Sequence, residues 1–154
     1  MSDKIERYND VTLATEENKE KLIDTYKKLA PEYNLMFARP NGEGFCFTPY
    51  KDCCYTYFLN DEAHSGYVTL TLDRASRKVN VKEFLFDDKC ALLRLLGFIR
   101  VFDGNYDFVS FSKLPVSSPV FEVIADENRL VKRSYVYDGQ ARILNMEKIL
   151  ESTV

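Results

Sequence analysis

The chain has no tryptophan, a single histidine and no cysteine pair at metal-binding spacing. A tetrahedral metal site would lack ligands, because His64 is the only histidine and no two cysteines form a Cys-x-x-Cys motif. The sequence therefore predicts neither a metal site nor a redox dithiol. The cysteines are expected to be reduced, mostly buried thiols of a cytoplasmic protein; they are Cys46, Cys53, Cys54 and Cys90.

A strong charge of either sign and a long apolar run are also absent. The formal net charge is −3 at pH 7, which gives no basic face for nucleic acid. No run reaches the apolar length of a membrane span, and the polar start MSDKIERYND does not resemble a signal peptide. We therefore expect no nucleic-acid partner, no membrane partner and a cytoplasmic location.

What the chain does have is a globular composition. Its 154 residues predict one domain over 1–154 with a sizeable core, and residues 1–14 are expected to include a frayed end. Ten Tyr and eleven Phe predict that the core is rich in aromatic side chains. Neither internal repeats nor low-complexity linkers interrupt the sequence.

The most informative stretch runs from Lys78 to Asp103. Val79 and Val81 alternate with polar residues, which is the period of a half-buried strand. The apolar positions then shift by one, to Phe84 and Phe86, so the strand Lys78 to Phe86 contains either a bulge or a part buried on both faces.

A strongly apolar helix is predicted from Cys90 onward. Its period of apolar residues is helical, and few polar residues interrupt it, so it should lie in a core against a sheet. Asp87 or Asp88 is expected to cap its first turn. The expected face comprises Leu92, Leu93, Leu96 and Ile99, widened by Leu95, Phe98 and Phe102.

The remaining segments complete an α+β pattern. Strands are predicted at Val11 to Ala14, Phe45 to Thr48, Cys53 to Leu59, Gly66 to Asp73, Asp107 to Ser112, Arg129 to Tyr137 and Gln140 to Leu144. Further helices are predicted from a Thr15 cap to about Ala30, near Pro119 to Ala125, and from Asn145 to Ser152. An antiparallel meander followed by a strand–helix–strand crossover predicts a mostly antiparallel sheet with helices on both faces.

This order of elements, with an irregular strand before the central helix, resembles the GNAT acetyltransferase fold. The phrases VKEFLFDDKCALLRLLGFIRVFD and YVYDGQARILNMEKILES are similar to the central domain of acetyltransferases of the "enhanced intracellular survival" type. The resemblance covers residues 18–152 and is strongest over 66–152. The segments that show it are Gly66 to Phe86, Ala91 to Asp103, Leu114 to Pro119 and Arg142 to Leu150.

The resemblance implies acetyl-CoA as cofactor and an amine as acceptor, of the aminoglycoside or lysine type. It implies partners as well: a catalytic GNAT domain, a sterol-carrier-like domain, or further copies of the chain. The sequence stops soon after the last predicted helix, at Ser152-Thr153-Val154, which suggests a chain cut at a domain boundary.

The sequence departs from the GNAT pattern where that family binds the pyrophosphate of coenzyme A. The pattern there is R/Q-x-x-G-x-G/A, whose glycines bring backbone N–H groups close to the phosphates. This chain has Phe86-Asp87-Asp88-Lys89-Cys90-Ala91, with no glycine. The cofactor-binding position, Asp88 to Cys90, is therefore expected to be degenerate, and the isolated chain catalytically incomplete.

The resemblance also suggests catalytic candidates. Glu83 corresponds to a general base, and Tyr135 and Tyr137 to a general acid. The structural alternatives are favoured: a surface or strand-edge glutamate, and two half-buried sheet tyrosines.

Two further features have a functional and a structural interpretation. Cys90, at a helix N-terminus, is either a reactive thiol or, as we favour, a buried one. The acidic residues either attract a polycation or, as we favour, lie in solvated turns; they are Asp61, Glu62, Asp73, Asp87 and Asp88. Three functions remain open: a supporting domain of an acetyltransferase, a self-sufficient enzyme with a degenerate phosphate loop, and a stand-alone binding module with the GNAT fold.

Overall fold

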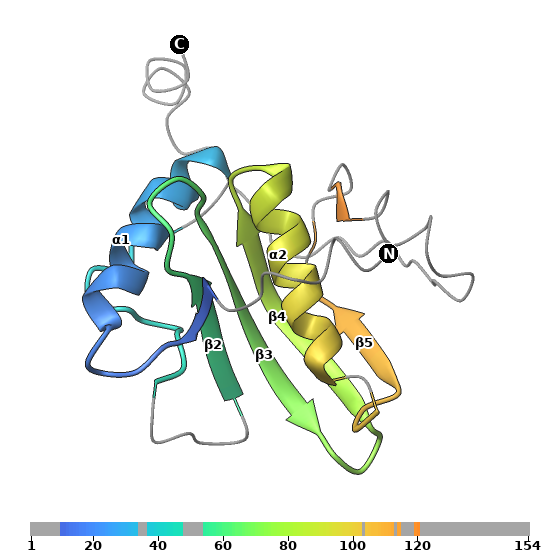
Figure 1. Cartoon of the computed structure of the whole chain (residues 1–154). Helices are drawn as coiled ribbons and strands as arrows, with labels where there is room; N and C mark the ends of the chain where they lie inside the picture. The colour runs from blue at the N-terminus through green and yellow to red at the C-terminus, as the bar shows by residue number, and fades with distance from the viewer. Residues whose placement is uncertain are drawn as a thin grey trace, which may run out of the picture. The chain divides into compact units, whose positions relative to one another are not determined.

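The computed structural model describes residues 10–33, 37–47, 54–102, 104–112, 114 and 119–120 (Figure 1). The chain divides into two compact units, Met1–Val120 and Phe121–Val154, and all described residues belong to the first. The predicted closing strands and the last two predicted helices, apart from Pro119 and Val120, lie outside the described residues. None of the described helices is both long and apolar enough to cross a membrane.

A five-stranded mixed sheet forms the first unit, with the strands in sequence order (Figure 1). The strands are β1 (Val11–Leu13), β2 (Cys54–Leu59), β3 (Gly66–Asp73), β4 (Lys78–Phe86) and β5 (Phe108–Phe111). Neighbours from β1 to β4 pair antiparallel, whereas β5 pairs parallel to β4. Because a parallel pair needs a crossover, this confirms the predicted strand–helix–strand unit and the α+β class.

The predicted irregularity in β4 is a bulge. Glu83 pairs with Thr69 and Val81 pairs with Leu70, which leaves Lys82 as the extra residue. One extra residue reverses the alternation of side chains. The bulge therefore turns Glu83 to the same face as Tyr67, whose hydroxyl donates to it.

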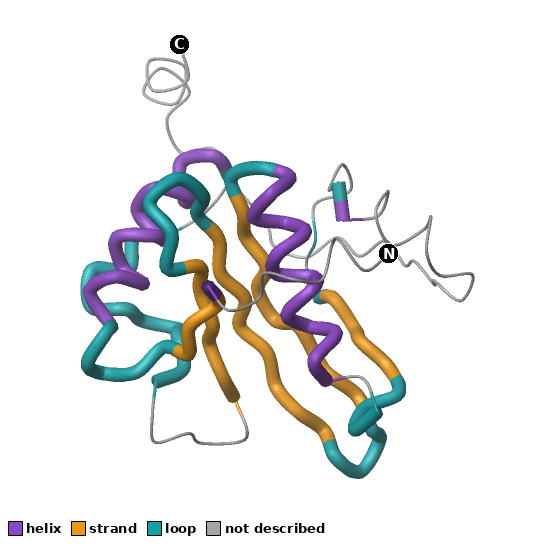
Figure 2. The backbone as a smooth tube through the Cα atoms, in the orientation of Figure 1, coloured by secondary structure: helices purple, strands orange, loops and turns teal. Residues whose placement is uncertain are grey.

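The two helices cover opposite faces of the sheet. α1 (Lys19–Leu29) packs Leu22, Tyr26 and Leu29 into a buried cluster with Tyr67 of β3. α2 (Lys89–Ile99) lies on the other face, where its Phe98 ring centroid is 4.4 Å from that of Tyr57. Tyr57 pairs with Val68, the neighbour of Tyr67, and consecutive strand residues point to opposite faces. Figure 2 shows both helices against the strands.

α2 approaches the sheet most closely at Gly66. A Cβ atom at this position would lie 2.9 Å from Leu95 Cδ1 and 3.1 Å from the Leu85 carbonyl oxygen. Glycine therefore allows the helix to pack directly on β3. The buried stripe of α2 is Ala91, Leu92, Leu95, Gly97 and Ile99. The expected face was therefore partly wrong, since its members Leu93 and Leu96 are only half-buried.

The helix ends differ from the prediction at one point. Asn18, not Thr15, precedes α1, and its side chain accepts a hydrogen bond from the Thr15 backbone N–H rather than from the helix. α1 ends at Leu29 and continues as a 3₁₀ turn over Ala30–Glu32, which contains Pro31. Proline, which has no backbone N–H, is tolerated there because N–H groups in the first turn of a helix have no partner within the helix. A second 3₁₀ turn, Arg100–Phe102, follows α2.

The segment 37–47 crosses the α1 side of the sheet as a loop. The strand predicted from Phe45 is wrong over residues 45–47, where Phe45 is instead buried beside Tyr26 and Tyr67. A disulfide joins Cys46 to Cys54 of β2, so the prediction of reduced thiols is wrong for this pair. That prediction was a ground for the cytoplasmic location, which therefore loses this support, because disulfides are rare in the cytosol.

Candidate functional site

Carboxylates of the chain itself accept hydrogen bonds at and next to the first turn of α2. Asp88 is the N-cap, and its Oδ1 accepts a hydrogen bond of 2.8 Å from the Ala91 backbone N–H. This confirms the predicted cap. Burial opposes ionisation of Asp88, but hydrogen bonds from Ala91 and His64 outweigh it and lower the pKa of its carboxyl group below the ordinary value.

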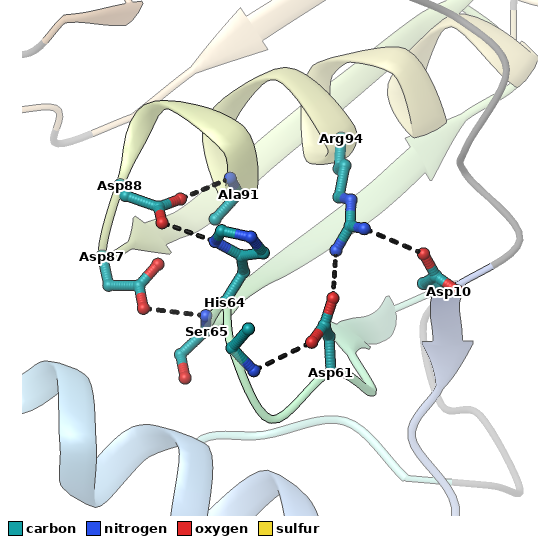
Figure 3. A network of polar contacts seen from close by, with 9 residues as sticks. Asp10, Asp61, His64, Ser65, Asp87, Asp88, Ala91 and Arg94 are labelled. Carbon is teal, nitrogen blue, oxygen red and sulfur yellow. Dashed lines mark hydrogen bonds and ion pairs between the residues drawn. The ribbon is translucent and has the colours of Figure 1, made fainter.

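The β2–β3 turn supplies a second layer of contacts to this helix end (Figure 3). Nδ1 of His64 lies 2.5 Å from Oδ2 of Asp88. The Ser65 backbone N–H donates to Oδ2 of Asp87 at 2.9 Å, and the Asp87 N–H donates back to the Ser65 carbonyl at 3.0 Å. The two carboxylates therefore hold the turn against the start of α2.

Arg94 fixes the same turn from the next coil of α2. Its guanidinium contacts Asp61 of the turn at 2.5 Å and Asp10, next to β1, at 3.3 Å (Figure 3). The hydrogen bond from Arg94, followed by one from the Ala63 N–H, lowers the pKa of the Asp61 carboxyl group. Arg94 thus links three segments, namely α2, the β2–β3 turn and the residue before β1.

Four of the five acidic turn residues bind within the chain, and the fifth, Glu62, is exposed. Asp61, Asp87 and Asp88 have the partners given above, and Asp73 accepts from the N–H groups of Ala75 and Ser76. The favoured interpretation as turn residues agrees with these positions.

The donor atoms of His64, Asp87 and Asp88 lie within 4.8 Å of one another, and such a set is able to hold a metal ion. These groups already bind each other, the Ser65 N–H and the α2 N-terminus. The positive end of the helix dipole disfavours an added cation. We therefore assign no metal to this cluster.

Lys89 and Cys90, the other expected cofactor-binding residues, are exposed at the start of α2. Cys90 is a free thiol, so the prediction of a buried structural thiol is wrong. Its position on the outward side of the first turn explains the difference, because the buried stripe begins at the next residue, Ala91.

Glu83, the expected general base, lies on the opposite face of the sheet in an ion pair. Its two carboxylate oxygens accept hydrogen bonds of 2.6 and 2.9 Å from the guanidinium of Arg39. The Tyr67 hydroxyl donates to the same carboxylate at 2.7 Å. Glu83 is half-buried, and the pairing of β5 with β4 covers Lys78–Val81 and ends before Glu83. The prediction of a surface glutamate is therefore wrong, whereas its alternative, a strand-edge glutamate, is not contradicted.

The surroundings keep the Tyr67 hydroxyl and the Arg39 guanidinium protonated. Burial, and then the negative charge of Glu83, raise the pKa of Tyr67 far above 10, so its hydroxyl remains a donor. Burial alone would lower the pKa of Arg39, but the hydrogen bonds and charge of Glu83 raise it overall. Glu83 therefore binds a permanent cation and a permanent hydrogen-bond donor.

The predicted catalytic and cofactor-binding residues do not form one site within the described residues. Glu83 and Asp88 belong to separate groups of contacts, and Tyr135 and Tyr137 lie outside the described residues. Sequence reasoning missed Arg39, which is 44 positions from Glu83, and the role of His64 at the helix cap. Arg39 begins the sequence Arg39-Pro40-Asn41-Gly42, which is typical of a turn but does not indicate the partner of Arg39.

A family model described as an acetyltransferase (GNAT) domain matches residues 39–143, which is more than half of the chain. The chain belongs to the GNAT acetyltransferase family. No curated protein and no solved structure matches it. The GNAT match includes Glu83, the Asp87–Asp88 turn, Tyr135 and Tyr137, so every predicted site residue falls inside the family's domain. The bulged β4, followed by α2 and the parallel β5, agrees with the GNAT fold expected from the sequence.

Proposed function

We propose that this chain is a supporting domain of an amine N-acetyltransferase of the "enhanced intracellular survival" type. In this proposal the domain does not hold acetyl-CoA, and the transfer takes place in a partner domain. The observation that supports it most directly is the occupied N-terminus of α2, where Asp88 accepts the Ala91 N–H and also contacts His64.

A coenzyme A pyrophosphate needs unpaired backbone N–H groups and a positive surrounding at such a helix end. Here the carboxylate of Asp88 takes the Ala91 N–H, and the carboxylate of Asp87 takes the neighbouring Ser65 N–H. Two like charges within a few ångströms of each phosphate would cost on the order of 1 kcal/mol each at partly exposed positions. We infer that these residues do not fit the cofactor's pyrophosphate.

The state of Glu83 supports the same proposal. A general base must be free to receive a proton from the acceptor amine. Glu83 is instead paired on both oxygens with Arg39 and also accepts from Tyr67. An amine would have to displace a bidentate guanidinium before it reached this carboxylate.

The test is a calorimetric titration of coenzyme A and acetyl-CoA into the full chain. We expect no heat of binding up to about 1 mM ligand, and we expect the Asp87→Asn/Asp88→Asn variant to bind more tightly. Removing about 1 kcal/mol per charge corresponds to roughly a thirtyfold gain in affinity for the double variant. Asparagine remains a good N-cap, so the helix should persist.

Asp73→Asn is the control, since it removes a carboxylate charge from the β3–β4 turn, at the opposite end of β4 from the start of α2. It should leave affinity for coenzyme A unchanged. Micromolar binding of acetyl-CoA by the wild-type chain would contradict the proposal and would favour a self-sufficient enzyme with a degenerate phosphate loop.

A stand-alone binding module with the GNAT fold is the second candidate. The half-buried Arg39–Glu83 pair favours it, because a sheet face already organised around a cation is suited to recognition. Co-purification of the full chain with a catalytic acetyltransferase domain would favour the supporting role. The proposal of a supporting domain has three further parts. The acceptor is an amine of the aminoglycoside or lysine type, the partners are flanking domains or further copies of the chain, and residues 1–154 form a single domain. The cytoplasmic location also belongs to this proposal, and the redox state of Cys46 and Cys54 in cells would test it.

A further inference from the structure

On the α1 side of the sheet, the Arg39 guanidinium lies against the rings of Tyr26 and Phe45 and the carboxylate of Glu83, and these three side chains are called the Arg39 pocket below. The Arg39 Cζ atom is 4.8 Å from the ring centroid of Tyr26 and 4.9 Å from that of Phe45, and its nitrogen atoms bind both oxygens of Glu83. We propose that this pocket is a guanidinium-binding site that Arg39 occupies in cis. A small-molecule guanidinium binds there when Arg39 is withdrawn.

The geometry selects a guanidinium over an ammonium. Two parallel hydrogen bonds to one carboxylate match the planar fork of a guanidinium, whereas an ammonium presents a single point of charge. Contact with two aromatic rings adds a cation–π attraction that suits a flat, weakly hydrated cation. Arg39 meets both conditions at once, with bonds of 2.6 and 2.9 Å and two rings within 5 Å.

Most of the pocket is built independently of Arg39. Glu83 is oriented by the Tyr67 hydroxyl of the neighbouring strand and by the bulge at Lys82. Tyr26 is buried on α1, where its own hydroxyl donates to the Phe37 carbonyl. Removal of the guanidinium therefore leaves the carboxylate and at least one ring wall in place.

Arg39 itself belongs to a surface loop rather than to the sheet. The Gly42 N–H donates to the Arg39 carbonyl, and the loop folds back so that a Cβ on Gly44 would lie 3.5 Å from Arg39 Cζ. The side chains of Arg39 and Glu83 are 17% and 27% exposed, so solvent reaches the ion pair. The Cys46–Cys54 disulfide holds the far end of the loop, and with it Phe45, on β2. Because Arg39 belongs to the loop and Glu83 to β4, the ion pair joins two segments that are not paired strands.

This inference does not depend on whether the domain binds acetyl-CoA, because the pocket and the α2 N-terminus lie on different groups of residues. It assigns a guanidinium ligand to Glu83, the carboxylate that the GNAT resemblance suggested as a general base.

The test uses the full-length Arg39→Ala variant with ethylguanidinium as the probe. Ethylguanidinium should raise the thermal unfolding midpoint of the variant in a saturable manner at millimolar concentration. Wild-type protein should show a response at least tenfold weaker, since Arg39 competes from within the chain. Ethylammonium, at the same concentration and ionic strength, should produce at most a tenth of the shift.

The matched control is the double variant Arg39→Ala/Glu83→Gln, which keeps the shape of the pocket and removes its negative charge. It should lose the saturable response to ethylguanidinium. An equal response in the double variant, or equal shifts with ethylammonium, would overturn the proposal. If Arg39→Ala does not fold alone, the same titration is followed as refolding. Recovery with ethylguanidinium only would support the site, and recovery with neither or with both cations would refute it.

Discussion

Two of the charged pairs in this domain, His64–Asp88 and Arg39–Glu83, contain residues that the sequence predicts as the cofactor position and the general base of a GNAT enzyme, yet the two pairs differ in environment. At the start of α2, the His64–Asp88 pair is partly exposed, with side-chain exposures of 29% and 43%. Across the sheet, the Arg39–Glu83 pair is flanked by aromatic rings and exposed by only 17% and 27%. Both groups consist of the chain's own side chains and solvent reaches both, but the Arg39–Glu83 pair is the less exposed of the two.

This difference predicts two kinds of energetic role. The more exposed His64–Asp88 pair is screened by solvent and salt, and such a pair contributes up to about 1 kcal/mol to the free energy of unfolding. Removing one partner of the less exposed pair is expected to lower stability more, because the remaining partner is left with an uncompensated, partly buried charge. The Arg39 pocket should therefore dominate stability, and the α2 cluster should mainly tune the local helix end and the charge that a ligand meets there.

The largest effect is expected for Glu83→Ala. This change leaves the Arg39 guanidinium and the Tyr67 hydroxyl without their shared acceptor. We expect a loss of about 3 kcal/mol in the free energy of unfolding, at the lower end for a buried pair because water still reaches this one. Urea unfolding followed by circular dichroism measures it.

Glu20→Ala provides the control, since Glu20 is an exposed glutamate of α1. Its effect should stay within about 0.5 kcal/mol. Equal losses for the two variants would mean that the Arg39 pocket is no more than a surface contact, and the contrast between the two regions would fail.

A somewhat smaller effect is expected on reducing the Cys46–Cys54 disulfide. The two cysteines are 8 residues apart, so the closed loop is short, and a loop of this size contributes about 2–3 kcal/mol in the chain-entropy account. Unfolding is compared with and without a reducing agent, and alkylation of the native, oxidised protein is mapped by mass spectrometry. Cys90, an exposed free thiol, should be labelled, and Cys46 and Cys54 should not.

A Cys46→Ala/Cys54→Ala variant separates the disulfide from other effects of the reductant. It should be less stable than the oxidised wild type and insensitive to reduction. Labelling of Cys46 in the native, non-reduced protein would show that the loop bearing Phe45 and Arg39 is not held by this bond.

Much of the sheet could be predicted because its signals are local. The period of two in β3 and β4 gave both strands their observed ends, and the change of parity between Val81 and Phe84 located the bulge. The Asp88 cap was predictable for the same reason, since a cap depends on residues within one helical turn.

The contacts that decide the site have no such local signal. Arg39 and Glu83 are 44 positions apart, and a charged residue in a turn does not reveal which strand it will meet. No local metal or redox spacing distinguishes Cys46 and Cys54 from free thiols, because their pairing depends on a loop that folds back onto β2. His64 in a polar turn gave no indication that the turn would reach the start of α2.

The smallest expected effect concerns the cap of α2, and pH provides its clearest test. The pKa of Asp88 lies below its ordinary value of 3.8, so its contribution to stability is fully present above that pH. It is lost as the pH falls through the lower folded-state pKa, because the protonated carboxyl no longer accepts from Ala91 and His64 as an anion. Asp88→Ala should cost about 1 kcal/mol at pH 7 as an N-cap, and Asp88→Asn only a few tenths. Between pH 5 and pH 2 the difference in unfolding free energy between wild type and Asp88→Asn should shrink toward zero. A difference that stays constant over this range would mean that the Asp88 charge does not stabilise the helix end, and that its role at the expected phosphate position is steric alone.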